Sequence, residues 1–137
     1  MDIADFHAYL ACFNRRDYDG VLKFWADDFT VSFAGYDFRG PREFIGFYRF
    51  FHKHVNETIA IDEFLSNDRM VVLEARVRLE GLVDISANDL QAAGYGRLMT
   101  PRVGQVVEIP QFIHYHLQGG KFSRVVCAVA AEPGFLS

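Results

Sequence analysis

The sequence predicts an α+β domain in which three helices pack against a curved mixed β-sheet and give the molecule a cone shape. The first observation is a change of apolar period: spacing is helical up to about residue 55 and strand-like after Asn56. The second is the segment 70–80, where apolar residues alternate with mostly charged ones. Because the chain has only 137 residues, we expect a single domain, 1–137.

The first two helices are predicted from spacing and capping residues. One face of the first helix is formed by Phe6, Tyr9, Leu10 and Phe13, at i, i+3, i+4 and i+7. Asp2 is expected as its N-cap. A second, short helix follows the polar break 14–17 and ends in the segment 24–28. Asp17 and the pair Asp27 and Asp28 are interpreted as cap and turn residues.

A first strand, 29–34, and a turn at 39–41 lead into the third helix, 41–55. Pro41 suits the first helical turn because a missing N–H has no consequence there. The inner stripe of this helix is formed by Phe44, Phe47, Tyr48, Phe51 and Val55. His52 lies at the margin of that stripe. Tyr36 and Asp37 are expected in the turn after the first strand, near the mouth of the cone.

Four further strands are predicted at 58–65, 70–80, 105–117 and 122–130, the last two joined by the turn 118–120. Pro110 indicates a bulge or an edge position, because proline cannot donate to a ladder. The connection 84–104 is long enough to be a lid or a binding loop. Within it, Ser86 is a candidate cap for a short helix.

Composition limits the functional classes. The formal charge is −4 and the basic residues are scattered, which argues against nucleic acid and against an anionic membrane surface. No apolar run reaches 18 residues and the N-terminus does not resemble a signal peptide, so we expect a cytoplasmic protein. Cys12 and Cys127 are expected to be free thiols. His114 and His116 share a strand face but lack a third ligand, so no metal site is expected.

Three stretches carry a resemblance that covers nearly the whole chain. They are 14–31, 40–48 and 100–110, with Gly120, Lys121 and Phe122 as a further match. On these residues the chain resembles the nuclear-transport-factor-two-like (NTF2-like) superfamily of cone-shaped α+β barrels. Within it, the chain is similar to the SnoaL-like polyketide cyclases and the ketosteroid isomerases. That fold hosts several reactions and also proteins without catalysis.

The resemblance implies roles residue by residue. Tyr9 matches a helix-1 tyrosine that donates to an oxyanion, and Tyr48 matches a supporting tyrosine of the third helix. The general base of the steroid isomerases falls on Phe33, and their protonated aspartate falls near Phe112. The aspartate–histidine pair of related dehydratases falls near Asn14 and Ala60. The acidic residue of the cyclases falls near Phe112 or Ile113. The family's usual acid and base positions are therefore not retained.

The candidate catalytic residues are Tyr9, Tyr48, His52 and Asp37. The two tyrosines would stabilise an enolate oxygen, and the alternative is that they are hydrogen-bonded core residues. His52 and Asp37 are the candidate bases. The alternatives are a partly exposed histidine at the helix margin and a turn aspartate that binds its own backbone.

The candidate ligand-binding residues are mostly aromatic: Trp25, Phe33, Phe47, Phe51, Gln111, Phe112 and Tyr115. Gln111 and Tyr115 alternate with Phe112 along one strand, so only one of the two sets can face inward. A bulge at Pro110 would reverse which set does. His114 and His116 are expected on the outer face with Glu74, Arg76 and Arg78, and the resemblance implies a homodimer that forms through this face.

These observations favour a small-molecule enzyme that acts on a hydrophobic carbonyl compound by isomerisation, cyclisation or dehydration through an enolate. No cofactor is expected, because the only Gly-x-Gly, at 94–96, lacks a strand–turn–helix context. The alternative is a non-catalytic protein that binds a hydrophobic ligand or serves as a dimeric accessory subunit. A pure interaction adaptor is a third possibility.

Overall fold

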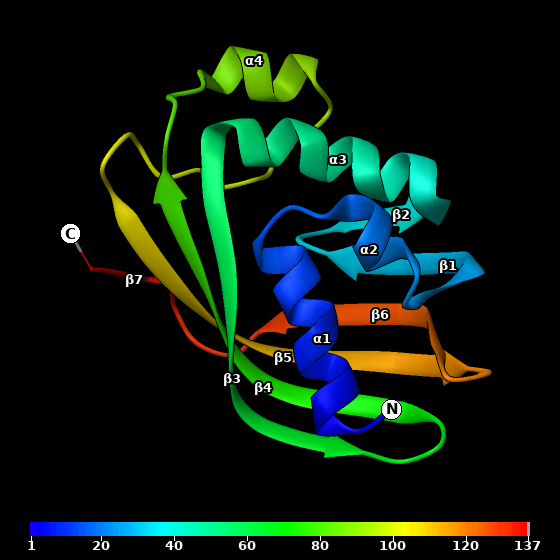
Figure 1. Cartoon of the computed structure of the whole chain (residues 1–137). Helices are drawn as coiled ribbons and strands as arrows, with labels where there is room; N and C mark the ends of the chain where they lie inside the picture. Colours follow the sequence, from blue (N-terminus) through cyan, green and yellow to red (C-terminus); the bar gives the residue numbers. More distant parts are fainter. Residues whose placement is uncertain (137) are drawn as a thin grey trace.

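The computed structural model of the chain describes residues 1–136, in which four helices lie against one strongly curved sheet (Figure 1). The helices are α1 (Ile3–Asn14), α2 (Tyr18–Leu22), α3 (Gly40–His54) and α4 (Ala87–Ala92). The strands are β1 (Trp25–Phe33), β2 (Tyr36–Arg39), β3 (Val55–Ser66), β4 (Met70–Gly81), β5 (Val106–Gln118), β6 (Lys121–Val129) and β7 (Gly134–Phe135).

The sheet is mixed and runs in the order β2-β1-β6-β5-β4-β3, with β7 paired to β5. Only the β1–β6 pair is parallel, and the other pairs are antiparallel. This confirms the expected α+β class and the curved mixed sheet. The sheet is open rather than a closed barrel, because β2 and β3 form its two edges. The short helix α4 is capped by the Ser86 hydroxyl, the residue that the sequence offered as a candidate cap for a short helix.

The interior between α1, α3 and the sheet is an aromatic core. Asp2 and Asp5 form a reciprocal capping box that starts α1, so its apolar face points inward from the first turn. The largest fully buried side chains include Phe6, Phe29, Phe44, Phe47 and Phe122. Burying a residue of this size contributes about 1.5–3 kcal/mol each, so these rings hold the helices on the sheet.

The first strand begins earlier than the sequence pattern predicts. β1 starts at Trp25, and Asp27 and Asp28 lie within the strand rather than in a turn. The β1–β6 register shifts between Trp25 and Thr30, which disrupts the alternation and hides the strand from a period-based prediction. Asp17 is the N-cap of α2, as predicted, and accepts a hydrogen bond from the Gly20 amide.

The facing of β5 is decided by its pairing with β4. The β4–β5 register is continuous through Pro110, so no bulge occurs there. Pro110 lies between the segment of β5 that pairs with β6 and the segment that pairs with β7, so its missing N–H interrupts no ladder. Ile113 and Tyr115 are consequently buried, while Phe112 and His114 are exposed on the outer face.

Among the described residues, none of the helices is long and apolar enough to cross a membrane.

Candidate functional site

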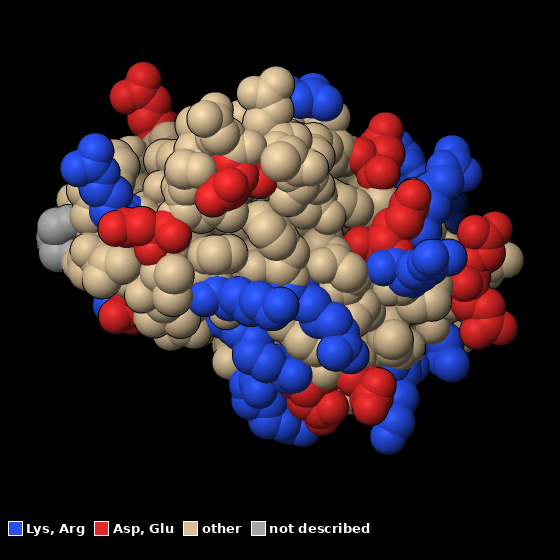
Figure 2. All heavy atoms as spheres, turned by 90° about the horizontal axis from the view of Figure 1, so that it is seen from above, with Lys and Arg blue, Asp and Glu red and all other residues tan. Residues whose placement is uncertain are grey.

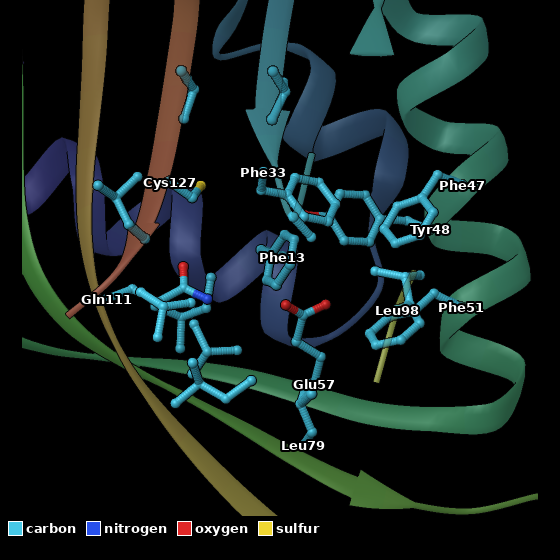
Figure 3. A pocket seen from close by; sticks show the side chains of 18 of the residues that line it. Phe13, Phe33, Phe47, Tyr48, Phe51, Glu57, Leu79, Leu98, Gln111 and Cys127 are labelled. Carbon is cyan, nitrogen blue, oxygen red and sulfur yellow. The ribbon is translucent and has the colours of Figure 1, made fainter. Parts of the chain in front are cut away.

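A cavity of about 280 Å³ lies between α1, α3 and the concave face of the sheet. Its wall is mostly apolar, with a few polar groups that point inward (Figure 3). The polar or ionisable members of the wall are Tyr9, Tyr48, Glu57, Arg97, Gln111, Tyr115 and Cys127. A concave, mostly aromatic cavity with a few converging polar groups is typical of small-molecule sites.

Glu57 provides the carboxylate of this cavity. The chain passes from α3 into β3 without a loop, so Val55, Glu57 and Ile59 all point to the concave face by strand alternation. Glu57 is the one buried charged residue among residues 1–136. Figure 3 shows its carboxylate directed from β3 into the cavity, towards Phe13 and Phe33. A buried carboxylate requires compensating partners, because leaving it uncompensated is strongly unfavourable.

The partner of Glu57 is His52, on the last turn of α3. The His52 Nε2 atom lies 2.9 Å from Glu57 Oε1, and the His52 side chain is only 4% exposed. On its other side, His52 Nδ1 lies 2.8 Å from the Tyr18 hydroxyl of α2. His52 is therefore behind the cavity wall, not in it, and is linked to the cavity by its contact with Glu57.

Three tyrosines, Tyr9, Tyr48 and Tyr115, are part of the cavity wall. Burial is the main cause that raises the pKa values of Tyr9, Tyr48 and Tyr115 above the usual tyrosine range, and the negative charge of Glu57 acts in the same direction. These hydroxyls therefore stay protonated near neutral pH and can act as hydrogen-bond donors. Burial also raises the pKa of the Cys127 thiol to about 12, so this group is not a nucleophile near neutral pH.

The segment that follows α4 forms part of the cavity wall. Arg97 and Leu98 line the cavity together with Ala34 of the β1–β2 turn. The Arg97 amide donates to the Tyr36 hydroxyl at 2.9 Å, and its guanidinium carbon lies 4.7 Å from the centroid of the Tyr36 ring. The connection 84–104 thus contributes Arg97, Leu98 and Met99 to the cavity wall.

Most of the candidate residues come together around the cavity: Tyr9, Tyr48, Trp25, Phe33, Phe47, Phe51, Gln111 and Tyr115 all line it. Phe112 does not, because it is 48% exposed on the outer face of β5. Asp37 does not either: it is exposed on β2, which is a strand and not the expected turn, and its carboxylate accepts a hydrogen bond from Ser32. The structure thus removes Asp37 as a base and Phe112 as a wall residue.

Two residues of the site, Glu57 and Tyr18, were not predicted from the sequence. Glu57 falls between the expected third helix and the expected strand 58–65, in a junction that was assigned to neither. The signal that reveals it is the continued alternation of Val55, Glu57, Ile59 and Ile61, which places an acidic residue on the apolar side of a strand. Tyr18 has no such signal, because its partner is 34 residues away in sequence.

No group of three potential ligands among the His, Cys, Asp and Glu residues is close enough to hold a metal ion within residues 1–136. His114 is exposed on the outer face. His116 lies beside Arg124, with Nε2 3.4 Å from an Arg124 nitrogen, and partial burial followed by this positive charge lowers the pKa of His116. The two histidines are therefore on the outer side of the sheet, as expected.

A sequence profile described as a SnoaL-like domain matches residues 6–125. Among curated protein sequences, none matches this chain.

Solved structures share the fold at low identity. A candidate polyketide cyclase from Pseudomonas putida KT2440 has 22% identity and a TM-score of 0.71, covering 90% of this chain and 86% of its own. A candidate polyketide cyclase from Xanthomonas campestris has 22% identity and a TM-score of 0.72, covering 89% and 84%. A computationally designed 17-OHP binder has 14% identity and a TM-score of 0.67, covering 94% and 93%. At these identities, the likeness concerns the fold alone.

Proposed function

The chain belongs to the SnoaL-like domain family, and from that premise we propose that it is a cofactor-independent enzyme that removes and returns a proton next to the carbonyl group of a hydrophobic compound. One observation carries the proposal: Glu57 places a buried carboxylate in an otherwise apolar cavity, supported from behind by His52 at 2.9 Å. A carboxylate that is poorly solvated and held in one orientation is a suitable general base.

The proposed reaction needs one base and one hydrogen-bond donor. Glu57 removes a proton from the carbon next to the carbonyl, and the electron pair moves onto the carbonyl oxygen to give an enolate. Tyr48, which lines the same cavity, donates a hydrogen bond to that oxygen. Return of the proton to a different carbon gives isomerisation. Attack of the enolate carbon on a second carbonyl of the substrate gives cyclisation, and Glu57 then returns its proton to the alkoxide that this attack forms.

The cavity supports a hydrophobic substrate of modest size. About 280 Å³ of space is bounded on the α3 side by Phe47 and Phe51 and on the sheet side by Ile109 and Ile113. Gln111 on β5 is a neutral polar group that lies across the cavity from α3 (Figure 3). A ring system with one or two oxygens fits this mixture of aromatic wall and isolated polar groups.

The test is hydrogen–deuterium exchange of 2-tetralone in D₂O, followed by proton NMR. The wild-type protein is expected to accelerate loss of the α-proton signals, and Glu57→Gln is expected to slow that exchange by about 10²–10⁴-fold. Glu80→Gln, at the end of β4, is the matched control and should exchange at the wild-type rate. Wild-type acceleration that survives Glu57→Gln would contradict the proposal.

A non-catalytic ligand-binding protein is the second candidate. It is favoured because Phe33 and Phe112 stand where the steroid isomerases have acidic residues, and because the designed 17-OHP binder has the same fold. This alternative predicts that a ligand binds in the cavity, detected by calorimetry, while the wild-type protein gives no exchange above the buffer rate.

A further inference from the structure

We propose that the substrate of this site is a hydrophobic carbonyl compound that also carries a carboxylate, and that Arg97 binds this carboxylate where the cavity meets solvent. The proposal rests on the proposed function, whose substrate class it narrows. Arg97 is then a positioning residue, because it holds the anionic end of the substrate while the carbonyl end reaches Glu57 and Tyr48.

Arg97 is the cation of this cavity. Among the described residues that line the cavity, no other is Lys or Arg, and Glu57 is the only Asp or Glu. The Arg97 side chain is exposed, so it lies at the edge of the cavity, whereas Glu57 is buried. A substrate carboxylate is attracted by the first group and repelled by the second. The two charges therefore fix the direction in which an anionic substrate enters.

The guanidinium of Arg97 is held in place with its hydrogen-bonding edge free. Its carbon lies 4.7 Å from the centroid of the Tyr36 ring, and the Arg97 amide donates to the Tyr36 hydroxyl at 2.9 Å. A guanidinium that lies over a ring uses its flat face for that contact, and its N–H groups remain at the edge of the plane. Within residues 1–136, no ion pair or side-chain hydrogen bond occupies these N–H groups. A carboxylate binds to such an edge through two parallel hydrogen bonds.

The turn between β1 and β2 makes room for this guanidinium. Phe33 and Tyr36 pair across the turn, and Ala34 and Gly35 have φ values of 52° and 80°, the type I′ geometry of a two-residue hairpin. A β-carbon at Gly35 would lie 2.7 Å from an Arg97 guanidinium nitrogen, so a side chain there would displace the guanidinium. Ala34 lines the cavity with a backbone conformation that alanine rarely adopts, and such conformations cluster at ligand-binding sites.

The cavity wall next to Arg97 is apolar. Leu98 and Met99 follow it in the chain and also line the cavity, and Figure 3 shows Leu98 on the same side of the cavity as Phe51. Apolar neighbours give the hydrophobic part of a substrate a surface to pack on, and they exclude water from beside the ion pair. This combination favours a hydrophobic carboxylic acid over a small inorganic anion.

The distribution of charge allows an anion to approach. The formal net charge of −4 would by itself repel an anion. Figure 2, which views the molecule from the side of α3 and α4, shows Lys and Arg side chains gathered in a band on this face. The negative charge is therefore distributed unevenly over the molecule, and α4 is the helix that precedes Arg97 in the chain.

The experiment is isothermal titration calorimetry with two bicyclic probes of nearly the same shape, the anion 2-naphthoate and the neutral 2-naphthamide. At low ionic strength, Arg97→Gln is expected to weaken 2-naphthoate binding by about tenfold or more, because charge-assisted hydrogen bonds are lost. Binding of 2-naphthamide should change by no more than about twofold, which also shows that the cavity of the variant is intact. Raising the ionic strength to about 0.5 M should weaken 2-naphthoate binding to the wild-type protein, because the pair is partly exposed.

Two further variants serve as controls. Arg97→Lys keeps the charge without the planar edge and should recover part of the lost 2-naphthoate affinity. Arg102→Gln removes an exposed arginine of the same connection that does not line the cavity, and it should bind both probes as the wild type does.

Equal weakening of both probes in Arg97→Gln, or unchanged binding of 2-naphthoate, would overturn the assignment. A wild-type protein that binds neither probe would overturn it too. So would 2-naphthoate binding with which saturating 2-naphthamide does not compete, because the anion would then bind outside the cavity. Failure of the proposed function is separate: it would be seen as 2-tetralone exchange that persists in Glu57→Gln, whereas the calorimetric measurement involves no proton transfer from the probe.

Discussion

Tyr48 is the residue whose hydroxyl the proposed reaction uses most directly. Burial, followed by the negative charge of Glu57, raises its pKa well above the usual tyrosine value, so the hydroxyl remains a neutral donor near neutral pH. We expect Tyr48→Phe to slow 2-tetralone exchange by about 10²–10³-fold, the usual effect of removing one oxyanion donor. Because Tyr48 does not lose its proton below the usual pKa range of tyrosine, the pH–rate profile of Tyr48→Phe should have the same shape as that of the wild type up to pH ~9.

Tyr95→Phe is the control for this substitution. Tyr95 packs edge-on against Phe47 with 5.0 Å between ring centroids and is not in the cavity wall. If 2-tetralone exchange slowed equally in Tyr48→Phe and Tyr95→Phe, the cause would be a general loss of packing rather than the loss of a hydrogen-bond donor.

The site was only partly predictable at this scale. Tyr9 and Tyr48 follow from helical spacing, because a helix face is fixed by a period that any single sequence displays. The position of Glu57 does not follow from helical spacing, because it depends on α3 passing into β3 without a loop. Asp37 was wrong as a base because the segment that contains it pairs with β1, and strand pairing depends on partners distant from the local pattern.

At the scale of elements, Gly81 marks the place where the end of β4 meets the segment before β5. A β-carbon at Gly81 would lie 1.9 Å from the Arg102 carbonyl oxygen and 2.8 Å from the Pro101 carbonyl oxygen, and both are backbone atoms that cannot move independently. We expect Gly81→Ala to lower the free energy of unfolding by about 1–3 kcal/mol, the typical consequence of overpacking. Urea denaturation followed by circular dichroism measures the change.

Gly46 offers the opposite case within the same protein. It lies in α3, and an added β-carbon meets nothing within 4 Å. Gly46→Ala is therefore expected to raise the free energy of unfolding by about 0.5–1 kcal/mol, because alanine has the higher helix propensity. If Gly81→Ala and Gly46→Ala changed the free energy of unfolding equally, the close approach of the Arg102 carbonyl would not be what excludes a side chain at Gly81.

The elements themselves were largely predictable, and the exceptions have one cause. The strand 70–80 and the third helix are confirmed because each has an uninterrupted period over at least ten residues. β1 and β2 were less well predicted because β1 carries a register shift after Trp25 and β2 has only four residues. A short or irregular strand leaves too few alternating positions to define a period.

At the scale of the whole molecule, the outer face of the sheet is the surface that we propose for pairing with a second copy of the chain. Arg76 on β4 bridges Asp62 at 2.9 Å and Glu108 at 3.7 Å, which joins β3, β4 and β5 by ion pairs. Phe112 lies opposite Glu74 in the same register and is exposed in the middle of this charged face. An exposed aromatic ring surrounded by ion-paired residues on a sheet face is a candidate centre of a protein–protein interface.

Sedimentation equilibrium tests this proposal. The wild-type chain is expected to sediment as a dimer, and Phe112→Glu is expected to weaken dimerisation by about tenfold or more, because it places a charge where a ring would be buried. Leu82→Glu introduces the same charge at an exposed position beyond the end of β4 and should leave the dimer intact. A monomeric wild type, or equal weakening in both variants, would exclude pairing through Phe112. Because Phe112 points away from the cavity, loss of the dimer should not change the rate of 2-tetralone exchange, and this separates the role of the outer face from that of Glu57.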